Sequence, residues 1–172
     1  MRKNYPLYET TVFEDFRIMT ENVADRYPDR VAFAYKDKPT DKDLVVMTYS
    51  EAREYIRNLG TGLISMGYSD KHVALVGESS VDWICSYFAL MSIGSVVVPI
   101  DKDLPASDIL DILNTAACEH LLYSSSIHAK IQEVVSSVPT LKTKVCMGIP
   151  AISDAFSISD VVRKGAALFE AG

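Results

Sequence analysis

The stretch that decides the fold runs from Gly77 to Asp101 and reads GESSVDWICSYFALMSIGSVVVPID. Ser79 or Ser80 can cap a helix, and Asp82 follows in its first turn, where the positive end of the helix dipole favours an anion. An almost unbroken apolar run then leaves this helix no polar face, which is typical of a helix covered on most sides. Gly94 ends it.

A β-branched strand follows the helix directly. Residues 95–100 show no polar alternation, which predicts a strand buried on both faces of a parallel sheet. Pro99 is expected near the end of that strand, because proline cannot donate to a central hydrogen-bond ladder. Turn, helix and buried strand together predict one crossover of an α/β fold.

The rest of the chain alternates between short apolar strands and amphipathic helices. Further strands are predicted at residues 31–35, 44–48, 72–76, 120–123 and 143–147, and further helices at 12–27, 48–66, 105–116, 126–138 and 157–169. Alternating strands and helices predict right-handed crossovers and a three-layer α/β sandwich, a mainly parallel sheet covered by helices on both faces. The first two strands, joined by the charged loop 36–43, predict a small N-terminal β-hairpin at the sheet's edge.

Two capping boxes mark helix starts in the first third of the chain. Thr11 with Glu14 predicts the first helix, and Thr48 with Glu51 predicts the second. Gly67 is expected to end the second helix in the left-handed conformation.

Size and charge limit the function classes. The 172 residues fit a single unit, residues 1–172, either a domain or one lobe of a larger one. A net charge of −6 without a compensating basic stripe argues against a nucleic-acid partner, which needs a cationic face. Residues 1–5 carry two cations without an apolar stretch, and 89–100 is too short to span a bilayer, so no secretory signal or transmembrane segment is expected and a cytoplasmic location is predicted.

Candidate chemistry in this sequence is weak, and each candidate has a structural alternative. Gly77–Ser80 follows a strand and opens a helix, as a pyrophosphate site does, but it has one glycine instead of three, and Glu78 would repel phosphate. Ser124–Ser126 could hold an anion at a helix start, although serines more often cap the helix. We therefore expect helix caps at both places.

Three other groups of residues are candidates for sites. Carboxylates near the end of the 95–100 strand could bind Mg²⁺, but solvated loop charges are the better interpretation; they are Asp101, Asp103, Asp108 and Asp111. The histidines, His72, His120 and His128, lack the spacing of metal ligands, which predicts structural roles for them. The cysteines, Cys85, Cys118 and Cys146, are odd in number and have apolar neighbours, which predicts buried free thiols. Trp83 and Tyr87, one turn apart, are expected to be core residues.

Several segments, in one collinear order, resemble the early part of the adenylate-forming enzymes: acyl-CoA synthetases, luciferases and peptide-synthetase adenylation domains. Residues 79–83 match the family pattern N-x-x-E/D-W, and residues 93–101 match A-G-x-x-x-V-P-[IL]-D. Leu104-Pro105 matches the start of the proline-led helix that follows in the family. Thr48-Tyr49-Ser50-Glu51 resembles the TY-x-E start of a helix in the family. Residues 29–33, which follow Tyr27-Pro28, resemble the opening strand of the family.

This resemblance implies that the chain is the N-terminal lobe of an AMP-forming acyl-CoA ligase. The family makes its adenylate with a Ser/Thr/Gly-rich phosphate loop, a Tyr-Gly-x-Thr-Glu segment, a ribose-binding aspartate and a C-terminal lysine, none of which occurs here. The resemblance therefore implies ATP, Mg²⁺ and CoA for the parent enzyme, no cofactor, metal or catalytic residue in this chain, and no activity of the chain alone. A tail similar to V-x-x-x-G-x-x-L-x-x-x-G points to a long-chain fatty acid as substrate.

Other interpretations stay open on the sequence. An amino-acid adenylation domain shares the same early segment. A stand-alone interaction module would use apolar surface that the remainder of the ligase would otherwise cover, and such a surface would promote homodimers. A small Rossmann-like binding protein is disfavoured by the missing glycine-rich turn.

Overall fold

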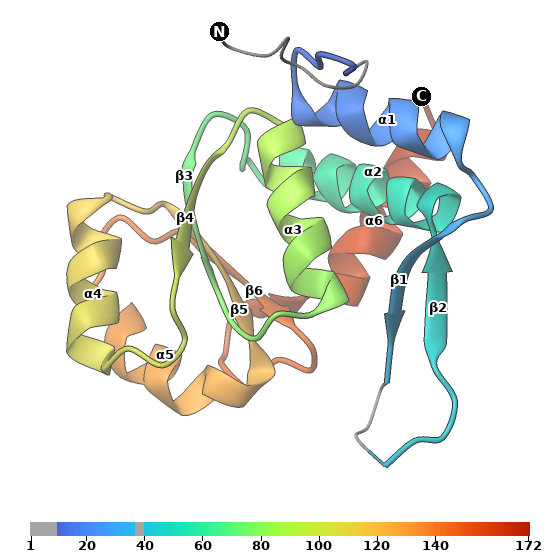
Figure 1. Cartoon of the computed structure of the whole chain (residues 1–172). Helices are drawn as coiled ribbons and strands as arrows, with labels where there is room; N and C mark the ends of the chain where they lie inside the picture. Colours follow the sequence, from blue (N-terminus) through green and yellow to red (C-terminus); the bar gives the residue numbers. More distant parts are fainter. Residues whose placement is uncertain (1–9, 37–39) are drawn as a thin grey trace, which may run out of the picture.

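The computed structural model describes residues 10–36 and 40–172, and its centre is a parallel sheet (Figure 1). The spatial order of its strands is β4-β3-β5-β6-β7, and every neighbouring pair is parallel. The strands are β3 (His72–Val76), β4 (Val96–Ile100), β5 (His120–Ser124), β6 (Thr143–Met147) and β7 (Ala155–Ser157).

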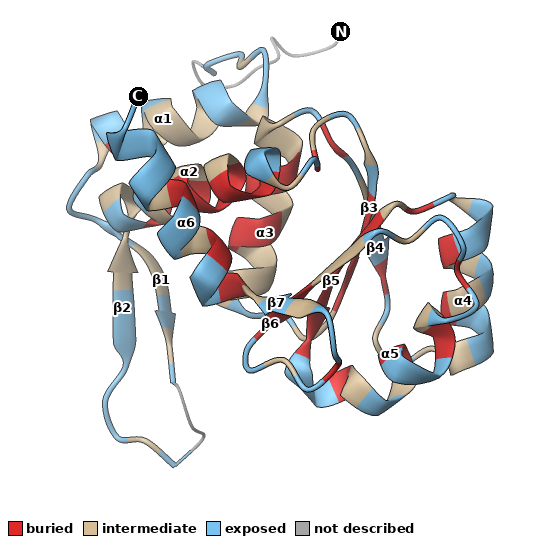
Figure 2. Cartoon of the chain, turned by 180° about the vertical axis from the view of Figure 1, so that it is seen from behind, coloured by how far each residue is buried: buried red, intermediate tan, exposed pale blue. Residues whose placement is uncertain are grey.

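Helices cover both faces of this sheet (Figures 1 and 2). One face carries α2 (Tyr49–Ser65), α3 (Val81–Ser92) and α6 (Ile158–Glu170), and the other carries α4 (Ala106–Thr115) and α5 (His128–Val135). α1 (Phe16–Arg26) packs on α2 and α3 from outside. The predicted three-layer α/β sandwich is confirmed.

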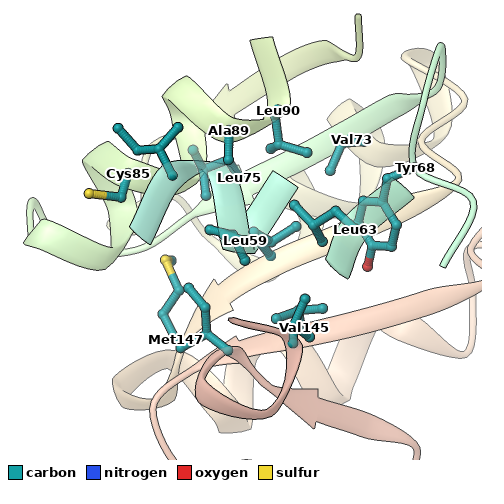
Figure 3. Packing of buried hydrophobic residues seen from close by; sticks show 14 residues of the cluster. Leu59, Leu63, Tyr68, Val73, Leu75, Cys85, Ala89, Leu90, Val145 and Met147 are labelled. Carbon is teal, nitrogen blue, oxygen red and sulfur yellow. The ribbon is translucent and has the colours of Figure 1, made fainter. Parts of the chain in front are cut away.

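The core is divided in two by the sheet, because side chains alternate along each strand. In β3, Val73 and Leu75 pack under α2 and α3, whereas Ala74 and Val76 face α4 and α5, and all four are fully buried. Figure 3 shows the first half, where helix residues such as Leu59 meet the strands. Both faces of β3 are apolar because both are covered.

The small N-terminal hairpin exists, but it does not lie at the edge of the main sheet. β1 (Val31–Tyr35) and β2 (Val45–Thr48) pair antiparallel in a separate two-stranded sheet that projects from the body (Figure 1). Thr48 ends β2 and at once caps α2, so the chain enters the helical layer without joining the main sheet. Residues 37–39 of the predicted loop lie outside the described residues, as do residues 1–9.

The first helix is shorter than predicted. It begins at Phe16 instead of residue 12, because the Asp15 side chain accepts a hydrogen bond from the Ile18 amide at 2.7 Å and so caps it. The capping box expected from Thr11 and Glu14 is therefore wrong. The second box is confirmed: the amide of Thr48 donates to Glu51 at 2.7 Å, and the amide of Glu51 donates to Thr48 Oγ1 at 3.3 Å.

The strand of the Gly77–Asp101 stretch is an edge strand. β4 pairs only with β3 in this sheet. Val97 packs on one half of the core and Val98 and Ile100 pack on the other, so both faces of the strand are covered as predicted, but Val96 at its start is 51% exposed. Pro99 is accommodated because one side of an edge strand makes no ladder bonds, and its missing amide proton costs nothing there. The helix of the same stretch behaves as predicted: Ser80 caps it, and none of its residues is exposed.

Two differences lie in the last third of the chain. The helix predicted for 126–138 is a 3₁₀ turn, Ser125–Ile127, followed by α5, which stops at Val135. The sequence does not predict β7, because three residues are too few for a strand pattern to stand out.

Candidate functional site

The order of the strands marks one place for a site. β4 lies on one side of β3 in the sheet, and β5, the next strand in the sequence, lies on the other side of β3. The order in which strands are added to the sheet therefore reverses between β3 and β5, at their carboxyl ends. Ligands of open α/β sheets bind in the crevice at such a switch point. The loops that meet there are the two sequence candidates, Gly77–Ser80 and Ser124–Ser126.

The two loops are joined by hydrogen bonds through Glu78. Its backbone amide donates to Ser124 Oγ at 3.2 Å, and Ser126 Oγ donates to its carboxylate. Gly77 permits this contact, since a Cβ at that position would lie 2.0 Å from Ser124 Oγ. The switch point is thus closed by a serine–glutamate contact between neighbouring strands.

Glu78 also sets the charge at the switch point. The hydrogen bond from Ser126 is the main cause that lowers the pKa of its carboxyl, and Lys102 adds a smaller effect in the same direction. A carboxylate therefore already lies at the position that a phosphate would need, and it would repel one.

The two capping expectations have different outcomes. Ser80 caps α3, because its Oγ accepts a hydrogen bond from the Trp83 amide at 3.1 Å. The serines of Ser124–Ser126 make no side-chain cap, and Ser124 and Ser126 bind Glu78 instead. Spacing alone could not show this, because Glu78 and Ser126 are 48 residues apart.

A cavity of about 320 Å³ lies beside this contact, between the carboxyl ends of β3 and β4. The residues that line it include Trp83, Pro99, Asp101 and Lys102. Trp83 stacks on Tyr87, with ring centroids 5.9 Å apart and an interplanar angle of 13°. Both rings pack against the core as partly buried residues, as expected, but Trp83 also lines the cavity, which the sequence pattern did not indicate.

The acidic residues near this cavity do not form a metal site. Asp101 accepts from the Asp103 amide at 2.9 Å, and Asp103 pairs with Lys102 at 2.7 Å. Lys130 Nζ donates to two carbonyls of the same loop, those of Lys102 and Leu104. Among the described residues, no group of three or more His, Cys, Asp or Glu side chains is arranged to hold a metal ion.

The histidines bind backbone and side-chain groups of the fold. His72 Nδ1 lies 2.6 Å from the Ala116 carbonyl, and His128 Nε2 accepts from the Ala151 amide at 2.8 Å. His120 stacks on Tyr68 at 4.0 Å, and its Nδ1 lies 2.7 Å from Thr143 Oγ1. Structural roles are thus supported for all three.

The three cysteines are buried free thiols, as predicted. Burial raises the pKa of Cys85 to about 12 and that of Cys118 to about 11. It also raises the pKa of Cys146. Such thiols stay protonated near neutral pH, and they are poor nucleophiles.

His120 makes the stability of the chain pH-dependent. Burial lowers its pKa below the ordinary value of about 6.5, although the Gly67 carbonyl near Nε2 acts in the opposite direction. Its neutral form is therefore favoured by folding: this contribution is complete above about pH 6.5 and is lost as the pH falls through the folded-state pKa.

We expect the unfolding temperature of the wild type to fall more steeply between about pH 7.5 and 5.5 than that of His120→Phe, in which this group cannot titrate. Thermal unfolding followed by circular dichroism measures both slopes. Equal slopes for the wild type and His120→Phe would contradict the assignment.

Comparison with known proteins identifies a family to which this sequence is similar. Residues 20–165 match the family model described as AMP-binding enzyme. The chain belongs to the AMP-binding enzyme family. The resemblance predicted from the Gly77–Asp101 stretch is therefore confirmed, and the switch point described above lies within the matched residues.

Relatives of this chain carry the names of different kinds of enzyme. The chain is 25% identical over 115 residues to tyrocidine synthase 1 of Brevibacillus parabrevis, covering 66% of the chain and 10% of that protein. It is 30% identical over 98 residues to a long-chain-fatty-acid–CoA ligase of Mycobacterium bovis, covering 56% of the chain and 16% of the ligase. Relatives thus include both a tyrocidine synthase and a fatty-acid ligase.

Solved structures show the same fold. A long-chain-fatty-acid–CoA ligase from Archaeoglobus fulgidus superposes with a TM-score of 0.79 at 19% identity, covering 92% of this chain and 31% of the ligase. The chain therefore spans less than a third of that structure. No helix among the described residues is long and apolar enough to cross a membrane.

Proposed function

We propose that the chain is the N-terminal lobe of an AMP-forming acyl-CoA ligase that activates a long-chain fatty acid. The parent enzyme would convert ATP and the carboxylate into an acyl-adenylate and pyrophosphate, after which the CoA thiol takes the acyl group and AMP leaves. The observation that carries the proposal is the family match over residues 20–165 in a chain that spans only 16% of the mycobacterial ligase.

The residues present do not fit ATP or Mg²⁺ at the switch point. Glu78 places a carboxylate where a phosphate would bind, and a single glycine precedes the helix. The acidic residues nearby bind backbone amides and lysines instead of converging. We therefore assign no catalytic, cofactor-binding or metal-binding residue to this chain, and the nucleotide and CoA contacts would come from the remainder of the ligase.

The chain would support the parent enzyme structurally. The cavity beside Trp83 and Lys102 opens at the carboxyl edge of the sheet, the edge where α/β proteins bind their ligands. It would form part of the wall of the acyl pocket, with residues 1–172 acting as one subdomain. Buried free thiols agree with the cytoplasmic location that is part of this proposal.

An amino-acid adenylation domain is the main alternative, and the similarity to tyrocidine synthase 1 favours it. A stand-alone interaction module is a third candidate. Exposed apolar side chains on the projecting hairpin, such as Val31 at 54% and Val46 at 49%, favour that function and homodimers.

Pyrophosphate exchange distinguishes these functions. The complete reading frame and the 172-residue chain are each incubated with ATP, Mg²⁺ and labelled pyrophosphate, together with palmitate or with a mixture of amino acids. We expect palmitate-dependent exchange by the complete protein and background exchange by the 172-residue chain. Exchange that depends on an amino acid would support the peptide-synthetase alternative, and exchange by the shorter chain alone would contradict the proposed division of the enzyme.

A further inference from the structure

The loop between β4 and α4, residues 101–105, lies at the carboxyl edge of the sheet. Two of its residues, Asp101 and Lys102, line the cavity beside Trp83, whose volume is about 320 Å³. A shift of this loop would therefore change the shape of the cavity. The contacts that hold the loop in place thus bear on which ligands the cavity accepts.

Hydrogen bonds inside the loop set its local shape. The amide of Asp103 donates to Asp101 Oδ1 at 2.9 Å, and the amide of Leu104 donates to the Asp101 carbonyl at 3.3 Å. Lys102 pairs with Asp103 at 2.7 Å, but the Asp103 side chain is 78% exposed, and such a pair contributes little to stability. All of these bonds join residues of the loop to each other, so they do not fix its position on the rest of the fold.

Lys130 of α5 supplies hydrogen bonds that join the loop to another element. Its Nζ donates to the carbonyl of Lys102 at 2.6 Å and to that of Leu104 at 2.7 Å. The donor and its acceptors are 28 and 26 positions apart in the sequence, and the loop lies beside α5 (Figure 1). Hydrogen bonds from an ammonium group are charge-assisted and stronger than neutral ones. One side chain thus clamps residues 102–104 to α5.

The contacts of Lys130 constrain the backbone of the loop. The side chain is partly buried, and the two carbonyls are the hydrogen-bond acceptors that it reaches among the described residues. A neutral side chain of similar length at this position would leave both carbonyls without their charged donor. The loop would then keep its local shape but lose its attachment to α5.

The cavity is the part of the acyl pocket that this chain would supply under the function proposed above. Trp83, Pro99 and Ile100 are among its lining residues and can give it apolar surface. One methylene group in an apolar pocket changes specificity by about tenfold or more, so small changes in the depth of such a pocket alter its preference between chain lengths. A loop held in one place favours one range of chain length, whereas a loose loop does not.

We propose that Lys130 is a positioning residue of the parent ligase, which holds the β4–α4 loop against α5 and thereby sets the length of acyl chain that the cavity accepts. This inference rests on the function proposed above. Lys130 does not line the cavity itself, so it acts through the backbone of residues 102–104.

The kinetic test uses the complete protein, with pyrophosphate exchange measured against the concentration of palmitate or of octanoate. Lys130→Met should raise the apparent KM for palmitate about fivefold or more and lower the preference for palmitate over octanoate, while kcat and the KM for ATP stay within about twofold. Lys130→Arg keeps a cationic donor and should retain at least about half of the wild-type preference. Lys164→Met is the matched control, because Lys164 is exposed on α6 and does not line the cavity.

A second measurement tests the clamp without any substrate. In ¹⁵N NMR spectra of the 172-residue chain, Lys130→Met should shift the amides of Lys102, Asp103 and Leu104 more than Lys164→Met does. Circular dichroism checks the folding of each variant. Lys130→Gln, which removes the charge and shortens the side chain, replaces Lys130→Met if that variant does not fold.

The outcomes separate this inference from the proposed function. A wild-type protein without palmitate-dependent exchange would contradict the proposed function, and the chain-length role of Lys130 would fail with it, while the NMR shifts would still decide whether Lys130 positions the loop. With an active wild type, three results would overturn the inference alone: an unchanged preference in Lys130→Met, an equal loss of kcat on both substrates at unchanged KM, or loop amides that do not shift.

Discussion

Replacing Gly165 with valine is expected to abolish folding or to lower the free energy of unfolding by about 4 kcal/mol or more. Helices α2 and α6 cross at this residue, and a Cβ on Gly165 would lie 1.7 Å from the Asn58 carbonyl oxygen and 2.7 Å from the Gly62 nitrogen. Both obstacles are backbone atoms, so no side chain can rotate away, and the helices would have to separate. Urea unfolding followed by circular dichroism measures the effect.

The control for this substitution lies on the same helix. Ala167→Val introduces the same side chain at an exposed position of α6, and it should change the free energy of unfolding by about 0.5 kcal/mol or less. Comparable stabilities of the two variants would show that α2 and α6 do not approach as closely as described.

Replacing Leu59 with alanine is expected to lower the free energy of unfolding by about 3 kcal/mol. Leu59 is fully buried against the sheet, where it packs among residues of β3 and α3 (Figure 3). The loss combines the transfer free energy of the removed methyl groups with the cavity that they leave. The midpoint of urea unfolding should shift without a change in its slope.

Ile64→Ala is the matched control for Leu59, since Ile64 lies on the same helix but is 52% exposed. Its effect should be about 1 kcal/mol or less. A larger loss for Ile64 than for Leu59 would mean that α2 presents another face to the sheet.

The arrangement of the fold follows closely from local patterns in the sequence. The strands His72–Val76 and Thr143–Met147 have the predicted bounds, because runs of apolar residues between turn signals specify buried strands. Caps from Thr48 and Ser157 lie where hydroxyl and carboxylate residues precede an apolar helix. These features depend on neighbours in the sequence, and the sequence therefore predicts them.

The features that could not be predicted depend on the neighbours of each strand in space. The position of β4 at the edge of the sheet and the separation of the β1–β2 hairpin depend on which strands pair with each other. The sequence pattern of one strand does not specify its partner strands. The contact of Glu78 with Ser126 has the same origin, since it joins residues 48 positions apart in the chain.

The candidate site combines both kinds of feature. The resemblance of the Gly77–Asp101 stretch to the adenylate-forming enzymes predicted the family, and the family match confirms it. The sequence also argues against phosphate binding at Gly77–Ser80, because it places the carboxylate of Glu78 there, which would repel a phosphate. Only the structure shows that the carboxylate is held between two strands by serine hydroxyls.

Sequencing the source transcript beyond the codon for Gly172 tests the central claim most directly. If the chain is the N-terminal lobe of an adenylate-forming ligase, the next forty or so codons should encode a Ser/Thr/Gly-rich phosphate loop similar to Thr-Ser-Gly-Thr-Thr. A stop codon directly after Gly172, in a transcript verified from independent clones, would contradict the claim and would favour a stand-alone interaction module.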